Sequence, residues 1–218
     1  MLERLLQGSD RQLALIHSLL EAHETEIQEL VLHRQPLQLD PLITAVLADL
    51  EPTLIKNQIR VQLDVSPDLP VVEADATQLW RVYSNLITNA IKHNPHGIEV
   101  RLTASLTASR RPDQLGRSAQ IRWPSPDWQP RSPQTGQWLC CLVQDNGIGI
   151  PPAQRQRLFE LYARGARARY MPGLGLGLYL CRQIITAHGG DIGLLETPQG
   201  GATFWFTLPL AAPETTAV

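Results

Sequence analysis

Several residue types are scarce in this chain, and each scarcity narrows its possible classes. The 218 residues include only three cysteines, an odd number, and Cys140 and Cys141 are adjacent within an apolar run. This usage disfavours a disulfide framework or a cysteine metal site, and it favours reduced thiols that act as small hydrophobic side chains. No signal peptide is visible, and no apolar run approaches the ~18 residues that a membrane-spanning helix needs. We therefore expect a cytoplasmic chain, or the cytoplasmic part of a membrane-anchored protein.

Lysine is also scarce, because Lys56 and Lys92 are the only two among 19 basic residues and the other 17 are arginines. The net charge of −2 gives no overall attraction to nucleic acid, so we expect no nucleic-acid partner. Twelve of the arginines lie between residues 101 and 182, together with only four acidic residues. These arginines either form a solvated surface or, in part, contact phosphate.

Hydrophobic periodicity divides the chain into helices and strands. Asp40 followed by Pro41 resembles a helix start, and Asp75 is placed to cap a second helix. Residues 110–136 are rich in Pro, Ser and Arg and form a surface excursion, with a short strand at 119–123. Helices are expected over 2–33 (broken near 8–10), 40–57, 75–93, 151–162 and 174–188, and strands over 59–65, 71–73, 97–105, 138–145, 191–196 and 202–208.

This order of elements favours an α+β fold, a two-layer sandwich in which helices cover a mixed sheet, over a doubly wound parallel sheet. The apolar stripe of the first helix has little neighbouring chain to pack against, which indicates one strand of a helical hairpin or dimer bundle. We divide the chain into a helical segment (1–35), a main domain (36–211) with an insertion at about 106–137, and a tail (212–218).

Three segments are not explained by packing alone. In NLITNAIKH, Asn85 and Asn89 lie one helical turn apart, and Lys92 and His93 continue nearly the same stripe. Two neutral oxygen ligands and an ammonium group suit a Mg²⁺–polyphosphate, although asparagines that bond a neighbouring strand would give the same pattern.

The other two segments are glycine-rich. DNGIGI, residues 145–150, follows an apolar strand and is either a site where the backbone approaches a ligand or an ordinary turn. GLGLGLYL, residues 173–180, opens a helix and is either an anion site or a flexible loop. It matches neither the dinucleotide fingerprint GxGxxG nor the P-loop pattern.

Taken in order and spacing, these motifs resemble one family. NLITNAIKH resembles the N box of the GHKL (Bergerat-fold) superfamily, DNGIGI the G1 box, LFELYARG (158–165) the F box, and GLGLGLYL the G2 box. The ending GGDIGLLETPQGGATFWFTLPL resembles the last two strands of that fold. Over about residues 37–210, the chain is similar to the ATP-binding catalytic domain of a sensor histidine kinase.

The resemblance implies ATP and Mg²⁺ as ligands and gives each matching position a role. Asn89, supported by Asn85, would hold Mg²⁺, and Lys92 would contact phosphate oxygens. His93 would lie beside the adenine or ribose, while Asp145 would accept the adenine amino proton and so select adenine over guanine.

The remaining family positions lie in the glycine loops and the lid. Gly147 and Gly149 would let the backbone lie against the base, Phe159 would anchor the base of the lid, and Arg164 would stabilise charge on the γ-phosphate, which makes it catalytic together with Asn89 and Lys92. Phosphate cradling and lid hinging would fall to Gly173, Gly175 and Gly177. The other expected nucleotide contacts are Ile150, Leu174, Leu176, Leu178 and Thr203. His188 is expected to be a helix C-terminal residue rather than a ligand.

A phosphoacceptor histidine of the family lies in a motif such as H-E-x-x-T/N-P-L, and none of the six histidines is followed by that pattern. The first helix resembles the second helix of the family's dimerisation hairpin, which favours a fragment of a longer kinase over a complete short protein. We expect that the chain binds ATP·Mg²⁺ but does not autophosphorylate alone.

The leading hypothesis is phosphoryl transfer from ATP to a histidine on its own or a partner hairpin, then to the receiver domain of a response regulator, with a homodimer in the full-length form. A protein-serine kinase of the anti-sigma type and a non-enzymatic nucleotide-binding module remain as alternatives. A gyrase-type ATPase is disfavoured, because it would need a water-activating carboxylate where Asn85 stands.

Overall fold

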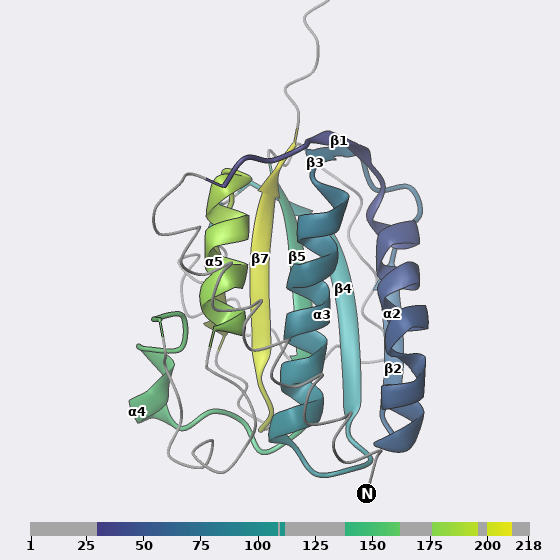
Figure 1. Cartoon of the computed structure of the whole chain (residues 1–218), viewed down its shortest axis with the longest axis vertical. Helices are drawn as coiled ribbons and strands as arrows, with labels where there is room; N and C mark the ends of the chain where they lie inside the picture. Colours follow the sequence, from purple (N-terminus) through teal and green to yellow (C-terminus); the bar gives the residue numbers. More distant parts are fainter. Residues whose placement is uncertain (1–29, 109, 112–137, 162–175, 196–199, 211–218) are drawn as a thin grey trace, which may run out of the picture.

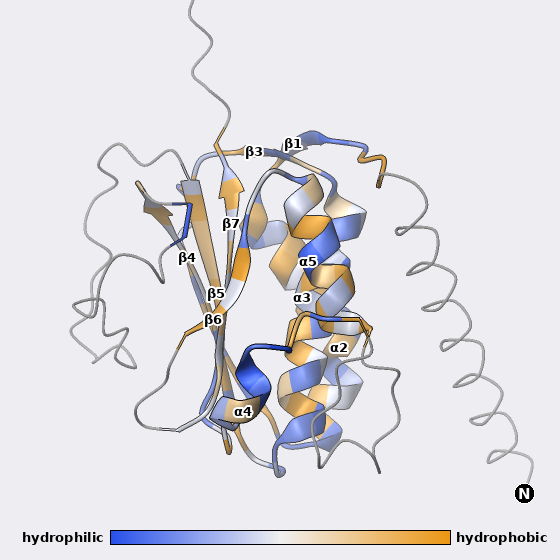
Figure 2. Ribbon diagram, turned by 90° about the vertical axis from the view of Figure 1, so that its left-hand side faces the viewer, coloured by the Kyte–Doolittle hydropathy of each residue, from blue (hydrophilic) through white to orange (hydrophobic). Residues whose placement is uncertain are grey.

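The structure is a computed structural model that describes residues 30–108, 110–111, 138–161, 176–195 and 200–210. Its elements form two layers, with a twisted sheet on one side and three long helices on the other (Figures 1 and 2). In chain order they are β1 (Gln35–Leu37), α2 (Leu39–Lys56), β2 (Arg60–Val65), β3 (Val72–Ala74), α3 (Ala76–His93), β4 (Glu99–Thr107), β5 (Trp138–Asp145), α4 (Pro152–Arg155), α5 (Gly177–Ala187), β6 (Ile192–Leu195) and β7 (Thr203–Pro209).

The main sheet is mixed. Its five strands are in the order β2-β4-β5-β7-β6, and β2 is parallel to β4 while every other pair is antiparallel. The predicted α+β sandwich with a mixed sheet is therefore confirmed. β5 covers the predicted residues 138–145, and the exposure of β2 alternates along the strand as the sequence pattern indicates.

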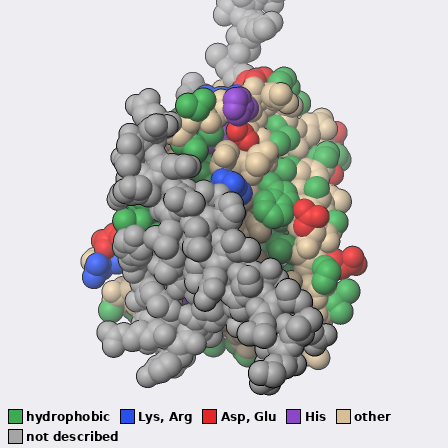
Figure 3. Space-filling view, in the orientation of Figure 1, with side chains coloured by type: hydrophobic (Ala, Val, Ile, Leu, Met, Phe, Trp, Pro, Cys, Tyr) green, Lys and Arg blue, Asp and Glu red, His purple; other side chains and the backbone are tan. Residues whose placement is uncertain are grey.

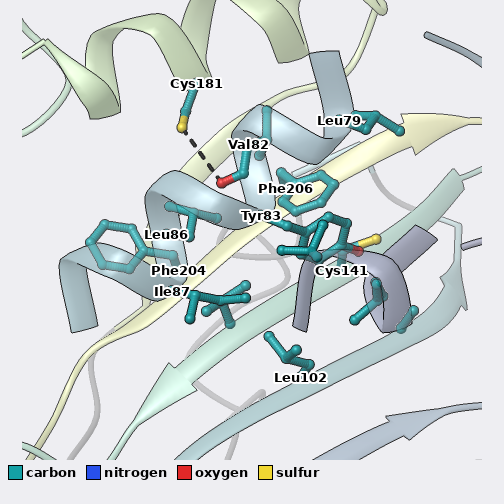
Figure 4. Close-up of a cluster of buried hydrophobic side chains, with 14 of the residues drawn as sticks. Leu79, Val82, Tyr83, Leu86, Ile87, Leu102, Cys141, Cys181, Phe204 and Phe206 are labelled. Carbon is teal, nitrogen blue, oxygen red and sulfur yellow. Dashed lines mark hydrogen bonds between the residues drawn. The ribbon is translucent and has the colours of Figure 1, made fainter. Parts of the chain in front are cut away.

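The core lies between the sheet and α3. Leu79, Val82, Tyr83, Leu86 and Ile87 of α3 point toward the strands and are at most 1% exposed (Figure 4). The Tyr83 ring packs edge-on against Phe206 of β7, with ring centroids 5.3 Å apart. This packing fixes the rotation of α3, and so decides which of its residues turn away from the core.

The start of α3 is capped as predicted. Asp75 Oδ1 accepts a hydrogen bond from the backbone N–H of Gln78 at 3.0 Å, which satisfies one of the free donors at the helix start. The prediction for α2 was less accurate, because Asp40 lies inside the first turn and the N-cap is Gln38, which makes no side-chain capping bond.

Two helix predictions fail at their ends. The first helix was predicted through residue 33, but residues 30–34 are not helical; the backbone N–H of His33 instead donates to Asp75 Oδ2 at 3.0 Å, and β1 pairs with β3 just beyond it. Residues 1–29 and the predicted strand at 119–123 lie outside the described part of the chain.

The second helix prediction, over residues 151–162, fails after the end of α4. The structure has one helical turn, and the chain then continues in three-residue turns, with Arg157 N–H donating to Gln154 O at 3.3 Å and Glu160 N–H to Arg157 O at 3.1 Å. Bonds of this i→i+3 kind keep the chain wound without forming an α-helix.

Charged side chains are scattered over the described part of the helical face and do not form a continuous patch of one sign (Figure 3). Within the described ranges, no helix combines the length and the low polarity required to span a bilayer.

Candidate functional site

The N and G1 motifs meet at one end of the molecule, where α3 and β5 end, and α5 begins beside the middle of α3 (Figure 1). The Asn94 side chain, directly after α3, donates to the Asp145 carboxylate at the end of β5. At the middle of α3, Asn85 Oδ1 lies 3.0 Å from the position that a Cβ on Gly177 would take. The C-terminal half of α3 thus contacts both glycine-rich segments.

The Asp145 carboxylate is buried, with 3% of the residue exposed, and its two oxygens are in different environments. Oδ1 accepts three hydrogen bonds, from Gly147 N at 2.9 Å, Asn94 Nδ2 at 3.1 Å and Ala202 N at 3.3 Å. Among the described residues, none donates to Oδ2. The carboxylate is therefore held by one oxygen and keeps the other as an acceptor for a ligand.

Burial raises the pKa of Asp145, while the bonds from Gly147, Ala202 and Asn94 act in the opposite direction and only partly offset it. All three partners are neutral N–H donors, which stabilise the ionised carboxylate. These donors therefore help to keep Asp145 in the form that can accept two further N–H bonds at Oδ2.

The glycines of the G1 segment are required by contacts inside the protein. A Cβ on Gly147 would lie 1.8 Å from Asn94 Oδ1, and a Cβ on Gly149, whose φ is +72°, would lie 2.9 Å from Gly201 O. Gly201 itself has φ +81° and would place a Cβ 1.9 Å from Asp145 O. The loop before β7 thus closes tightly over the end of β5, which a side chain at any of these positions would prevent.

The polar residues Asn85, Asn89 and Lys92 lie along the C-terminal half of α3, which ends at this site. Asn85 lies against the first turn of α5, while Asn89 is half-buried and Lys92 is exposed. Neither the Asn89 carboxamide nor the Lys92 ammonium group makes a hydrogen bond or ion pair with another described residue. No group of three or more His, Cys, Asp or Glu residues that could hold a metal occurs in the described ranges, so a cation here would depend on carboxamide oxygens and on its ligand.

His93 follows Lys92 at the end of α3. Desolvation and the neighbouring Lys92 charge lower the pKa of the His93 ring. A neutral ring at this position is suited to lie against a base or a sugar.

The start of α5 has no side-chain capping bond from the described residues. Its N-cap, Leu176, is buried and provides no side-chain acceptor, and Gly177 is the first helical residue. An uncapped helix start presents N–H groups at the positive end of the helix dipole, which suits an anion. Leu178 is half-buried and packs on the core.

The segment after DNGIGI is attached to the same end. Ile150 packs on the core and its carbonyl accepts from Arg155 Nε at 2.9 Å. Phe159 meets Phe204 of β7 edge-on, with centroids 6.3 Å apart and an interplanar angle of 87°. Four of the predicted site residues, Arg164, Gly173, Leu174 and Gly175, lie outside the described part of the chain.

Thr203 does not belong to this group. It pairs with Gln144 across β5 and β7, and because side chains alternate along a strand, it points to the opposite face of the sheet from Asp145 and Phe204. The hydrogen bond to Asp145 from this end of β7 comes instead from the backbone N–H of Ala202. Asn94 was also missed, although an asparagine just beyond a helix, next to a motif, is a usable signal for a side chain that bonds across a turn.

The expectations for His188 and the cysteines are confirmed. His188 is the C-cap of α5 and is 1% exposed; its Nδ1 donates to Ile184 O at 2.8 Å and its Nε2 accepts from Asp75 N at 3.0 Å. All three cysteines are free and buried, and burial raises the pKa of Cys140 and of Cys181 to about 12, so both remain protonated thiols.

Comparison with solved structures supports the fold. The full-length histidine kinase ShkA, solved in complex with AMPPNP, superimposes with a TM-score of 0.75 at 24% identity, over 97% of this chain and 38% of ShkA. The histidine kinase ThkA, in a complex with the response regulator TrrA, gives a TM-score of 0.67 at 21% identity, over 97% of this chain and 52% of that one.

The sequence is also similar to a protein named a sensory kinase and to one named a sensor protein. The chain is 32% identical to the adaptive-response sensory kinase SasA of Synechococcus sp. (strain JA-2-3B'a(2-13)) over 197 residues, 90% of this chain and 45% of SasA. It is 31% identical to the sensor protein KdpD of Escherichia coli (strain K12) over 201 residues, 92% of this chain and 19% of KdpD. The chain thus spans less than half the length of these relatives.

The family described as "Histidine kinase-, DNA gyrase B-, and HSP90-like ATPase" matches residues 74–212. This match includes α3, the end of β5 and the start of α5, which together form the site. The chain therefore belongs to the family of histidine kinase-, DNA gyrase B- and HSP90-like ATPases.

Proposed function

We propose that this chain is the ATP-binding catalytic part of a sensor histidine kinase, which transfers the γ-phosphate of ATP to a histidine on a dimerisation hairpin for relay to a response regulator. The observation that carries the proposal is the asymmetric Asp145 carboxylate, with three donors on Oδ1 and none from the described residues on Oδ2. The named relatives favour a histidine over a serine acceptor, because one is named a sensory kinase and the other a sensor protein.

The base would bind at the end of β5. A 6-amino group is a donor that Asp145 Oδ2 can accept, whereas a 6-carbonyl would face a carboxylate and be repelled. Gly147 and Gly149 would bring the loop backbone close to the ring, and the neutral His93 ring would lie beside the base or ribose. This arrangement selects ATP over GTP.

The polyphosphate would extend from there along α3 to α5. Lys92 has no described partner and would neutralise phosphate oxygens, and the uncapped N–H groups from Gly177 onward would bind others. Leu176 directly precedes Gly177, and the G2 motif begins before it with Gly173, Leu174 and Gly175.

The site fits Mg²⁺ held mainly by phosphate. Asn89 is half-buried with a carboxamide that makes no hydrogen bond to another described residue, and Asn85 lies one turn before it, so both could offer the neutral oxygens that Mg²⁺ accepts beside its waters and phosphates. The ion would supply charge neutralisation on the transferred phosphate.

Transfer itself requires positioning rather than a covalent nucleophile. Phe159, packed on Phe204, would fix the base of a lid segment, and Arg164 would stabilise the γ-phosphate from within it. The receiving histidine would come from the hairpin of the same polypeptide or of a partner in a homodimer. The named partner of ThkA, a response regulator, supports the last step of the relay by analogy.

The test has a binding stage and a transfer stage. In the first, calorimetry with Mg²⁺ measures the dissociation constants of ATP and GTP for the chain and for Asn89→Ala. We expect a clear preference for ATP, and for Asn89→Ala a roughly tenfold loss of ATP affinity that is confined to solutions containing Mg²⁺. No saturable ATP binding by the unaltered chain would end the proposal.

In the second stage, the chain is mixed with γ-labelled ATP, with and without dimerisation hairpins from sensor kinases. Acid-labile label on an added hairpin is the expected result, because a phosphohistidine hydrolyses in acid. Acid-stable label on an added protein would point to serine transfer, and ATP binding without transfer to any hairpin would point to a non-enzymatic nucleotide-binding module.

A further inference from the structure

The Asn94 side chain makes three hydrogen bonds, which fix the direction of its carboxamide. Nδ2 donates to Ala90 O at 3.0 Å and to Asp145 Oδ1 at 3.1 Å, and Oδ1 accepts from Ile148 N at 2.8 Å. Both protons of the amide and its oxygen are therefore used. Asn94 links the last turn of α3 to the Asp145 carboxylate and to Ile148 of the G1 loop.

The contact between Asn94 and Gly147 is equally specific. The carboxamide occupies the space that a side chain on Gly147 would take, because a Cβ there would lie 1.8 Å from Asn94 Oδ1. The backbone of Asn94 is extended, at φ −120° and ψ 161°, which is the conformation that the following Pro95 favours. The Asn94 side chain thus points toward the G1 loop from an extended backbone, which is a conformation that many residues could adopt.

We infer that Asn94 is a positioning residue, which holds the Asp145 carboxylate so that Oδ2 remains the acceptor for the base and thereby sets the preference for a 6-amino purine. This inference rests on the proposed function, since it concerns the same site. Asn94 does not itself touch the base.

The physical reason lies in the geometry of the three donors. Gly147 N and Ala202 N belong to backbone segments on two sides of the carboxylate, and Asn94 Nδ2 is the side-chain donor among the three. Without it, Oδ1 keeps two bonds and the carboxylate can rotate between orientations. A hydrogen bond to an ionised group also stabilises its charged form, so its loss favours the protonated acid, which is a poorer acceptor.

The main variant is Asn94→Ala, and the matched control is Asn146→Ala. Asn146 lies in the same loop, and its Oδ1 accepts from Glu99 N at 2.8 Å. The control therefore loses one side-chain bond, where Asn94→Ala loses three, and it leaves every donor to Asp145 in place. Each protein is titrated with ATP and with inosine triphosphate, which carries a carbonyl in place of the 6-amino group.

For Asn94→Ala we expect ATP affinity to fall roughly tenfold and inosine triphosphate affinity to change less than about twofold. For Asn146→Ala the ratio between the two nucleotides should equal that of the unaltered chain. A lower affinity of Asn94→Ala for both nucleotides by the same factor would overturn the inference, because it would indicate a general structural role.

A second measurement needs no nucleotide. The carboxyl ¹³C signal of Asp145 is followed by NMR as the pH is varied, in the unaltered chain, in Asn146→Ala and in Asn94→Ser, whose shorter side chain is a milder change should Asn94→Ala not fold. The groups that act on this carboxyl in the described chain are the neutral donors of Gly147, Ala202 and Asn94. The pKa of Asp145 should rise in Asn94→Ser, which loses an N–H donor to the carboxylate, and should stay unchanged in Asn146→Ala.

An unchanged Asp145 titration in Asn94→Ser would overturn the inference even if ATP binds. Conversely, if the titration shifts but the unaltered chain prefers no nucleotide, the positioning role stands and the proposed function fails. The two outcomes are therefore distinguishable.

Discussion

Asp145 determines which hydrogen-bonding pattern a base must present. In Asp145→Asn the three N–H donors that surround Oδ1 will keep the amide oxygen in that place, so that the NH₂ group takes the position of Oδ2. A donor there opposes the 6-amino group of adenine and can bond the 6-carbonyl of guanine. We expect ATP affinity to fall roughly a hundredfold and the ATP-to-GTP preference to disappear, as measured by calorimetry.

The same substitution should not weaken the fold. Because burial raises the folded-state pKa of Asp145, the protonated form is favoured by folding, and that contribution is lost as the pH rises through the folded pKa. At neutral pH the ionised carboxylate therefore lowers the stability, and a neutral amide avoids this cost. Urea unfolding at pH 7 should give Asp145→Asn a free energy at least equal to that of the unaltered chain. A clear loss, absent in the exposed control Asp68→Asn, would contradict this account.

Gly147 and Asn94 should behave as a coupled pair. Gly147→Ala alone places a Cβ 1.8 Å from Asn94 Oδ1, and we expect it to lower the free energy of unfolding by about 1–3 kcal/mol. In the Asn94→Ala background the space is empty, so the added methyl group should cost much less. A double-mutant cycle of urea unfolding measures the coupling, and simple additivity of the two changes would show that the contact is not what requires glycine.

At the level of elements, α3 connects the core to the site, and its start is held by one carboxylate. Asp75 Oδ1 caps α3 through Gln78 N, and Asp75 Oδ2 accepts from His33 N. The hydrogen bonds outweigh the effect of burial and lower the pKa of Asp75. The N-cap and the attachment of residues 30–34 therefore depend on the same side chain.

Asp75→Ala should lower the free energy of unfolding by about 1–2 kcal/mol or more, because it removes the cap and leaves the N–H of His33 without its acceptor. Asp75→Asn keeps an acceptor at Oδ1, since asparagine caps helices well, and should lie between Ala and the unaltered chain. Chemical denaturation of the three proteins at pH 7 measures the order. Equal stability of the Ala and Asn variants would mean that the cap contributes little.

Most elements could be predicted because their signals are local. Alternation defined β2, an apolar run defined β5, and a capping aspartate with apolar residues at helical spacing defined α3. The three-residue strand β1 has no such signal, because it forms only through pairing with β3 about forty residues later. The turns after α4 have helical composition, and the packing of Phe159 on Phe204 is what draws that segment onto the sheet.

The motif DNGIGI identifies Asp145 as a candidate site residue, but the sequence does not identify the distant residues that bond its carboxylate. The bond between Asn94 and Asp145 joins residues 51 positions apart, and nothing near Asn94 in the sequence names its acceptor. The family resemblance assigns Thr203 to the nucleotide site, but the register of β7 turns its side chain to the other face of the sheet from Asp145. Strand register and long-range side-chain bonds are properties of the assembled fold.

At the scale of the whole molecule, the two ends of α3 have different roles. Its C-terminal end carries the candidate site, while its N-terminal end joins residues 30–37 to the end of α5. Arg34 Nη2 donates to Ala187 O at 2.7 Å, and His188, the next residue, accepts from Asp75 N at 3.0 Å. His33 and Arg34 are therefore attached through Asp75 and the Ala187 carbonyl. The buried His188 supports this attachment by accepting from Asp75 N, with its tautomer fixed by donation from Nδ1 to Ile184 O.

This histidine should make the stability of the domain depend on pH. Burial lowers the pKa of His188, with the nearby Arg34 charge acting in the same direction and Asp75 against it. The unfolded chain therefore binds a proton more readily, so stability is full above about pH 6.5 and falls as the pH drops toward the folded pKa, by at most about 1.4 kcal/mol per pH unit. His188→Gln, which does not titrate, should reduce this slope in urea unfolding between pH 7.5 and 5. His96→Gln, an exposed control, should leave it unchanged, and an identical slope in both variants would assign the effect to other groups such as His93, whose pKa is also lowered.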